Sequence, residues 1–147
     1  MKIDLDKSVN HRIAMLAVSL KRQVFRLIAD NKVDITPDQW VILYYLWEED
    51  GLPVGLLATK TRKDFANTTR IIDKLVKQKY VEKRKSETDS RVSHIFLLKR
   101  AHDIKESIHK CWEESTEIAM KGIDASEKLV LLNLLDRIEN NVLAQNN

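Results

Sequence analysis

The chain contains little glycine, proline or cysteine: three, two and one residues, respectively, among 147. Few glycines and prolines leave few positions for turns, so we expect long helices rather than a sheet of many short strands. The single cysteine, Cys111, cannot form a disulfide within the chain, which excludes a disulfide-stabilised secreted domain and favours a reducing compartment.

Long apolar segments are also absent. No run approaches the ~20 residues that a membrane-spanning helix needs, and the first ten residues, MKIDLDKSVN, are polar and partly acidic, unlike a signal peptide. Hydrophobic residues make up 44% and charged residues 32% of the chain. We therefore expect one soluble, cytoplasmic domain over residues 1–147, with no membrane partner.

Charge is distributed unevenly along the chain. Residues 60–100 contain 13 Lys/Arg and five Asp/Glu, a net charge of +8, whereas the remaining 12 Lys/Arg and 17 Asp/Glu give −5. A basic segment between acidic flanks indicates a surface that binds a polyanion. The alternative interpretation is an ordinary solvated helix face.

Apolar side chains recur at helical spacing along most of the chain. The predicted helices cover about residues 8–29, 36–48, 53–61, 63–79, 99–120 and 125–145. The strongest start signal is ITPDQW, in which Thr36 caps a helix, Pro37 lies in its first turn and Gln39 completes a capping box. Lys63 or Asp64 begins the fourth helix.

A β-hairpin is predicted between the fourth and fifth helices, because YVEKRK and SHIFLL are typical of strands and the polar SETDSR separates them. Helix, short helix, helix and hairpin, in this order, predict a winged helix-turn-helix. We expect a mainly α fold with a small β-hairpin wing. Its DNA-binding lobe would cover about residues 35–98, and dimerisation helices would cover about 6–30 and 99–145.

The fourth helix begins with short polar side chains in FANTTR, which let the backbone approach DNA closely. Asn67 can pair with an adenine edge, Thr68 and Thr69 can donate to a phosphate or touch a thymine methyl, and Arg70 can reach a phosphate or a guanine. The alternative is that these residues only suit a helix start. Further candidate DNA contacts are Lys60, Arg62, Lys63, Lys74, Arg84 and Lys85.

Residues 35–98 resemble the core of the MarR family of bacterial transcriptional regulators. The resemblance rests on TPDQWVIL, on NTTRIIDKLVKQKYVEKR and on the D-x-R element at residues 89–91. It implies that Arg91 enters the DNA minor groove and that Asp89 holds the shape of the wing. The sequence departs from the family after the wing, where Leu-Leu-Lys-Arg-Ala at 97–101 replaces Leu-Thr-x-x-Gly, and at 51–55, which is more apolar than Ser-Gln-x-Glu.

The resemblance also implies a homodimer that binds a pseudo-palindromic operator, and a small-molecule effector or oxidation that loosens DNA binding. The apolar helix faces outside the lobe agree with a dimer, although in a monomer they would pack only on each other. The candidate dimerisation residues are Val9, Ile13, Leu129, Leu132, Leu135 and Val142. We expect a repressor, and the effector is not identifiable from the sequence.

Other chemistry is weakly indicated. His102, Glu106 and His109 share one helix face, but two histidines and one carboxylate make an incomplete metal site, so we expect no metal and no cofactor. Cys111 is interpreted as a packed small hydrophobe. No catalytic motif is present, so we expect no enzyme. A winged-helix adaptor that binds an acidic protein remains the alternative, distinguishable by the salt dependence of binding.

Overall fold

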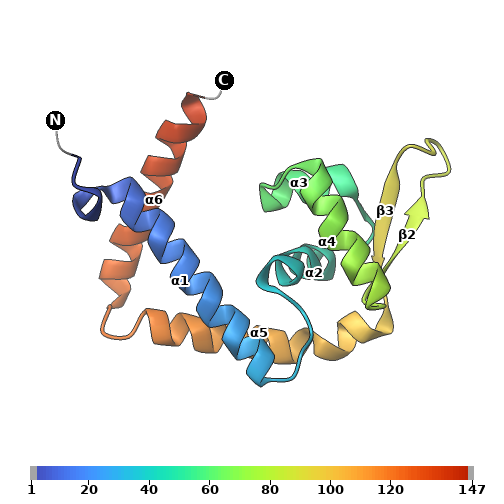
Figure 1. The fold of residues 1–147 in the computed structure, drawn as a ribbon, viewed down its shortest axis with the longest axis horizontal. Helices are drawn as coiled ribbons and strands as arrows, with labels where there is room; N and C mark the ends of the chain where they lie inside the picture. Colours follow the sequence, from blue (N-terminus) through green and yellow to red (C-terminus); the bar gives the residue numbers. More distant parts are fainter. Residues whose placement is uncertain (1–2, 146–147) are drawn as a thin grey trace. The chain divides into compact units, whose positions relative to one another are not determined.

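The computed structural model describes residues 3–145 and divides the chain into two compact units between Ser115 and Thr116. The elements are η1 (Leu5–Lys7), α1 (Val9–Asp30), α2 (Pro37–Glu48), β1 (Leu52–Pro53), α3 (Val54–Thr61), α4 (Phe65–Lys77), β2 (Val81–Lys85), β3 (Ser93–Leu97), α5 (Lys99–Ala119) and α6 (Ala125–Ala144) (Figure 1). The predicted mainly helical fold with a small β-hairpin is confirmed. Within the described part of the chain, no helix is long and apolar enough to span a membrane.

The sheet has three antiparallel strands in the order β1-β3-β2. The predicted hairpin pairs Val81 with Leu97 and Lys85 with Ser93. The short strand β1 was not predicted, and it pairs Leu52 with Ile95 on the other edge of β3. Because β1 leads directly into α3, this pairing fixes the base of the hairpin to the helix-turn-helix.

Local sequence signals set the helix starts. Thr36 Oγ1 accepts a hydrogen bond from the Gln39 amide (3.2 Å) and Gln39 Oε1 accepts one from the Thr36 amide (2.9 Å), which is the predicted capping box. Asp64 caps α4, and Asp124 forms a second capping box with Glu127 at α6. Helix α5 begins at Lys99.

The core of the first unit lies where α2, α3, α4 and the sheet meet, and α1 and α5 pack against it. Its most buried large side chains are Ile28, Ile42, Leu43, Leu46, Leu57, Ile72, Leu75, Tyr80, Ile95 and Ile108. The three helices of the lobe and the hairpin lie on this core, with the hairpin extending past α4 (Figure 1). Full burial of each such side chain stabilises the fold by about 1.5–3 kcal/mol.

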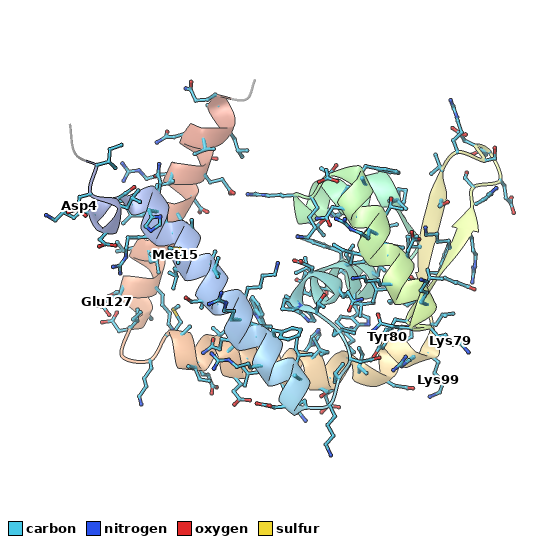
Figure 2. The ribbon with its side chains drawn as sticks, viewed as in Figure 1. Asp4, Met15, Lys79, Tyr80, Lys99 and Glu127 are labelled. Atoms are coloured by element: carbon cyan, nitrogen blue, oxygen red, sulfur yellow. The ribbon has the colours of Figure 1, made fainter. Side chains whose placement is uncertain are left out.

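A polar network ties the end of α4 to α5 and to the loop before α2. The Tyr80 hydroxyl donates to the Asp34 carboxylate, and Arg100 Nη2 donates to both Asp34 oxygens at 3.1 Å. Gln78 donates to the Asp34 carbonyl and accepts from buried Gln39 at 2.8 Å. Tyr80 lies at the foot of the hairpin near Lys99 (Figure 2). The network therefore joins the recognition helix to the first turn of α5.

Asp34 should make stability depend on acid pH. The hydrogen bond from Tyr80, followed by the charge of Arg100, lowers the pKa of Asp34 below 3.8. A lowered pKa in the folded state gives stability that is present above the unfolded-state pKa and is lost as pH falls through the folded-state pKa. We expect Asp34→Asn to reduce the free energy of unfolding at pH 7, with the difference from wild type shrinking below about pH 4.

Urea unfolding between pH 7 and pH 3, followed by tryptophan fluorescence, measures this difference. Asp30→Asn, at the exposed end of α1, is the control carboxylate. A difference between wild type and Asp34→Asn that stays constant over the whole pH range would contradict the assignment.

Gly51 should not tolerate a side chain. Its φ is +77°, in the left-handed region, and an added Cβ would lie 2.7 Å from Cε1 of Phe96. We expect Gly51→Ala to destabilise the protein by about 1–3 kcal/mol in thermal unfolding. Gly55→Ala is the matched control, because its Cβ would meet nothing within 4 Å, and helix propensity predicts a gain of about 0.5–1 kcal/mol. Equal melting temperatures for the two variants would contradict this account.

Candidate nucleic-acid interface

Helix α4 has one buried and one exposed face. Thr68, Ile71, Ile72 and Leu75 are buried in the core. Besides Phe65 at the start of the helix, the exposed side chains are Ala66, Arg70, Asp73, Lys74 and Lys77, with Asn67 partly exposed beside them. The exposed face thus combines small, amide and cationic side chains, which suit contacts with base edges and phosphates.

Asn67 and Arg70 act as a pair. Arg70 Nη2 donates a hydrogen bond to Asn67 Oδ1 at 2.8 Å. This bond orients the amide and the guanidinium together on the exposed face, one helical turn from the N-terminus of α4. Lys74 follows one turn later and forms no ion pair with another residue between 3 and 145.

The prediction for Thr68 is wrong. Its side chain is fully buried, and its hydroxyl donates to the Asp64 carbonyl at 2.8 Å, so it faces the core rather than DNA. Thr69 is partly exposed, but its Oγ1 is covered and has no hydrogen-bond partner in the described part of the chain. Of the two threonines, only Thr69 keeps surface that DNA could contact.

The N-terminus of α4 is more occupied than the sequence suggested. Asp64 Oδ1 accepts a hydrogen bond from the Asn67 amide at 2.7 Å, so this N–H group of the first turn is not free to bind a phosphate. Lys63 is only 20% exposed, and its ammonium lies 3.0 Å from Asp38, which also binds Lys21 at 2.9 Å. Burial raises the pKa of Asp38, but hydrogen bonds from Lys21 and Lys63 outweigh this effect and lower it overall.

The wing ends in a turn built around Asp89. Its Oδ1 accepts from the Arg91 amide at 3.0 Å, and its carboxylate accepts from the Arg91 guanidinium at 3.1 Å. The Arg91 hydrogen bonds, first from the side chain and then from the backbone, lower the pKa of Asp89. The backbone closes through Ser86 N to Val92 O at 2.8 Å and Val92 N to Asp89 O at 3.0 Å. Arg91 itself is 88% exposed at the tip.

The remaining predicted cations, together with Lys83, which was not a predicted DNA contact, surround this face. Lys83 of β2 binds Asp73 of α4 and so ties the wing to the recognition helix. Arg84 pairs with Glu82 and lies 4.2 Å above the Phe96 ring, whereas Lys85 is exposed. In α3, the Lys60 ammonium lies 5.3 Å from the Tyr45 ring, and Arg62 ends the helix in a left-handed conformation.

A groove of about 550 Å³ runs between α3, α4 and the wing. It is lined by Pro53, Val54, Gly55, Leu56, Phe65, Thr69, Lys83, Arg91, Val92 and Ser93. Sequence reasoning missed Phe65 and Leu56, which are 61% and 40% exposed. Helical periodicity gave no signal for Phe65, because position 65 falls on the same side of the helix as the buried positions 68, 72 and 75 and would be expected to be buried.

A second concavity, a cleft of about 730 Å³, lies between α1, the start of α2 and α4. Residues from α1 that the sequence analysis did not single out line it: Val18, Lys21, Arg22, Phe25 and Arg26. Asn67, Arg70 and Lys74 line the opposite wall. The surface of the cleft is mostly apolar, and five cationic side chains are among its lining residues.

Large apolar side chains remain exposed on the predicted dimerisation helices. Val9 of α1 is exposed and Ile13 is partly buried, and all four predicted α6 residues, Leu129, Leu132, Leu135 and Val142, are exposed. Helix α6 has no buried residue. The sequence analysis missed further exposed apolar residues: Met15, Leu16, Val18, Leu20, Val130, Leu131, Leu134 and Leu143.

The three metal candidates lie together, but two of them, Glu106 and His109, contact other side chains. His102, Glu106 and His109 line one shallow groove along α5. Glu106 binds Lys110 at 2.9 Å, and the His109 ring packs edge-on against Trp47 at 5.5 Å. Among residues 3–145, no group of three His, Cys, Asp or Glu side chains is arranged to hold a metal ion.

Cys111 is buried and accepts a hydrogen bond from Asn31 Nδ2 at 3.3 Å. Burial, followed by the nearby charge of Glu114, raises the pKa of its thiol. A raised pKa disfavours the thiolate that a redox sensor needs, so the geometry supports the interpretation of a packing residue. Trp40 is also buried, and its ring stacks on Trp112 with the ring centroids 4.6 Å apart.

Comparisons with known proteins agree with the geometry. The MarR family model matches residues 35–93. The HTH-type transcriptional regulator YsmB of Bacillus subtilis, itself uncharacterized, is 32% identical over 105 residues, which are 71% of this chain and 68% of that protein. The structure of a MarR protein from Peptoclostridium difficile superposes with a TM-score of 0.86 at 25% identity, covering 99% of this chain and 94% of that one.

A mutant MarR from E. coli complexed with operator DNA has a similar fold, with a TM-score of 0.82 at 22% identity over 88% of this chain and 92% of that one. The family model covers α2, α3, α4, β2 and the turn of the wing, and ends at the first residue of β3. The chain belongs to the MarR family of DNA-binding transcriptional regulators.

Proposed function

We propose that the protein is a homodimeric repressor that binds a pseudo-palindromic operator. The observation that carries this proposal is the exposed face of α4, with Asn67 and Arg70 bonded as a pair, next to a wing whose Arg91 is 88% exposed. Two-fold symmetry would place two such lobes on successive major grooves, ~34–36 Å apart. A repressor acts by occupying a promoter, which needs only tight and specific binding.

Each predicted side chain has a distinct role in this proposal. Asn67, Arg70 and Lys74 contact base edges and phosphates in the major groove, and Arg91 enters the narrow minor groove, where negative potential is concentrated. Asp89 holds the wing turn in shape. Phosphate contacts come from Lys60, Arg62, Lys63, Arg84 and Lys85. To bind a phosphate, Lys63 would have to give up its ion pair with Asp38, and Arg84 its ion pair with Glu82.

The proposal includes a small-molecule effector, and the cleft between α1 and α4 supports an anionic one. Its lining includes the Phe25 side chain, together with Arg22 and Arg26 of α1 and Arg70 and Lys74 of α4. A carboxylate on an apolar body fits both features. Because Arg70 and Lys74 also belong to the proposed DNA face, an occupant of the cleft would weaken DNA binding.

Fluorescence anisotropy against the intergenic DNA upstream of the protein's own coding region, with random DNA as competitor and across a salt series, tests the proposal. We expect competitor-resistant binding whose log–log salt slope is about −0.9 per phosphate contacted. Equal binding to random DNA would mean an operator elsewhere, which selection from a random library then identifies. If that selection also fails, the protein is not a sequence-specific regulator. The alternative is then an adaptor whose basic face binds an acidic protein.

A further inference from the structure

Phe65 occupies an unusual position for a large apolar side chain. It is the first residue of α4, directly after the Asp64 cap, and it is 61% exposed. Its ring makes no aromatic or cation contact with another residue between 3 and 145. Leu56 of α3, 40% exposed, lines the same groove. Packing within the chain therefore does not account for the two side chains.

The surroundings of Phe65 point to DNA. The groove reaches the first turns of α4 through Phe65 and Thr69, and the residue after Phe65, Ala66, is exposed. Two cations, Lys83 and Arg91, lie on the wing side of the groove. An apolar surface bordered by cations at the start of a recognition helix complements a base edge flanked by phosphates.

The major groove offers a single large apolar group, the 5-methyl of thymine. A phenylalanine ring cannot form a hydrogen bond with the polar edges of the other bases, and covering those edges would leave donors or acceptors unsatisfied. An aromatic ring at the first position of the helix therefore discriminates in favour of thymine.

We propose that Phe65 is a specificity-determining residue that recognises a thymine methyl in each operator half-site, with Leu56 completing the apolar contact. This inference rests on the proposed function. It predicts that the operator contains a thymine at the position facing the start of α4, and that the methyl group itself contributes to affinity.

The test replaces thymine by deoxyuridine, which lacks only the methyl group. The operator is first obtained by selection from a random library, and each half-site thymine is then replaced in both half-sites at once. We expect one position at which uracil weakens wild-type binding about fifteen-fold, from a four-fold loss for each methyl. Phe65→Ala should weaken binding to the thymine operator by at least as much and lose sensitivity to uracil at that position.

Two controls make the result specific. Phe65→Leu keeps an apolar contact and should retain part of the sensitivity to uracil. The melting temperature of Phe65→Ala should equal that of wild type, because the ring is mostly exposed.

Three outcomes would overturn the proposal: no uracil effect at any position, the same uracil effect in Phe65→Ala, or an equal loss by Phe65→Ala on every DNA sequence. The last would mean a contact with the sugar–phosphate backbone. Absence of any sequence-specific DNA binding by wild type would instead refute the proposed function, and this inference with it.

Discussion

Arg91→Ala is expected to weaken operator binding by about 100-fold without changing the melting temperature. The Arg91 side chain is 88% exposed at the tip of the wing and, among residues 3–145, its guanidinium hydrogen-bonds only to Asp89, so its loss leaves the core untouched. In a symmetric dimer the substitution removes two minor-groove contacts, and the effects of the two sites multiply. Anisotropy titration at fixed salt measures the loss.

Arg70→Ala is expected to have a similar effect through the major groove. This variant also frees Asn67, whose Oδ1 accepts the Arg70 hydrogen bond at 2.8 Å, so part of the loss reflects a less ordered amide. If Arg70 and Arg91 bind phosphates, each variant lowers the salt slope by nearly two, one contact per half-site. If they read bases or groove width, the slope changes little and specificity falls instead.

Lys121→Ala is the matched control for both arginine variants. Lys121 is an exposed cation in the turn after α5 and lies outside the proposed DNA face. Its loss should leave operator affinity within two-fold of wild type, apart from a small long-range charge effect. Unchanged affinity in both Arg70→Ala and Arg91→Ala would refute the assignment of the DNA-binding residues.

The features that could be predicted from the sequence are local ones. The capping box of Thr36 and Gln39 needs only residues three apart, and the turn at Asp89 and Arg91 needs only two. The hairpin could be predicted because, within about twenty residues, the helical spacing of apolar side chains gives way to two segments typical of strands. Such signals predict the start of α2 and the turn of the wing, because each depends on hydrogen bonds between residues only two or three positions apart.

Features that depend on distant contacts could not be predicted. Strand β1 exists because Leu52 pairs with Ile95, and the network on Asp34 joins residues 44 to 66 positions away. The burial of Thr68 depends on how α4 is rotated against the core, which the polar character of threonine does not reveal. The cleft beside Arg22 likewise requires α1 and α4 to be neighbours in space.

Leu135→Glu is expected to disrupt dimerisation and, with it, operator binding. Helix α6 has twenty residues and none is buried, although it carries eight large apolar side chains that are exposed. Most of the stability of a helix in a protein comes from tertiary packing of its apolar face, so a partner surface is needed to cover these side chains. Leu131, Leu134, Leu135 and Val142 fall on one side of the helix at 100° per residue.

A glutamate at position 135 would place one charge from each protomer in that apolar contact, and burying an unpaired carboxylate costs several kcal/mol. We expect a shift from dimer to monomer in sedimentation velocity, and loss of operator binding, because a single lobe contacts only one half-site. Asn133→Glu is the matched control, since it adds the same charge on the opposite, polar side of α6. If Leu135→Glu remains dimeric, α6 does not form the interface through this face. If it becomes monomeric and still binds the operator at full affinity, the two half-sites are not read together, and the symmetric model of recognition is wrong.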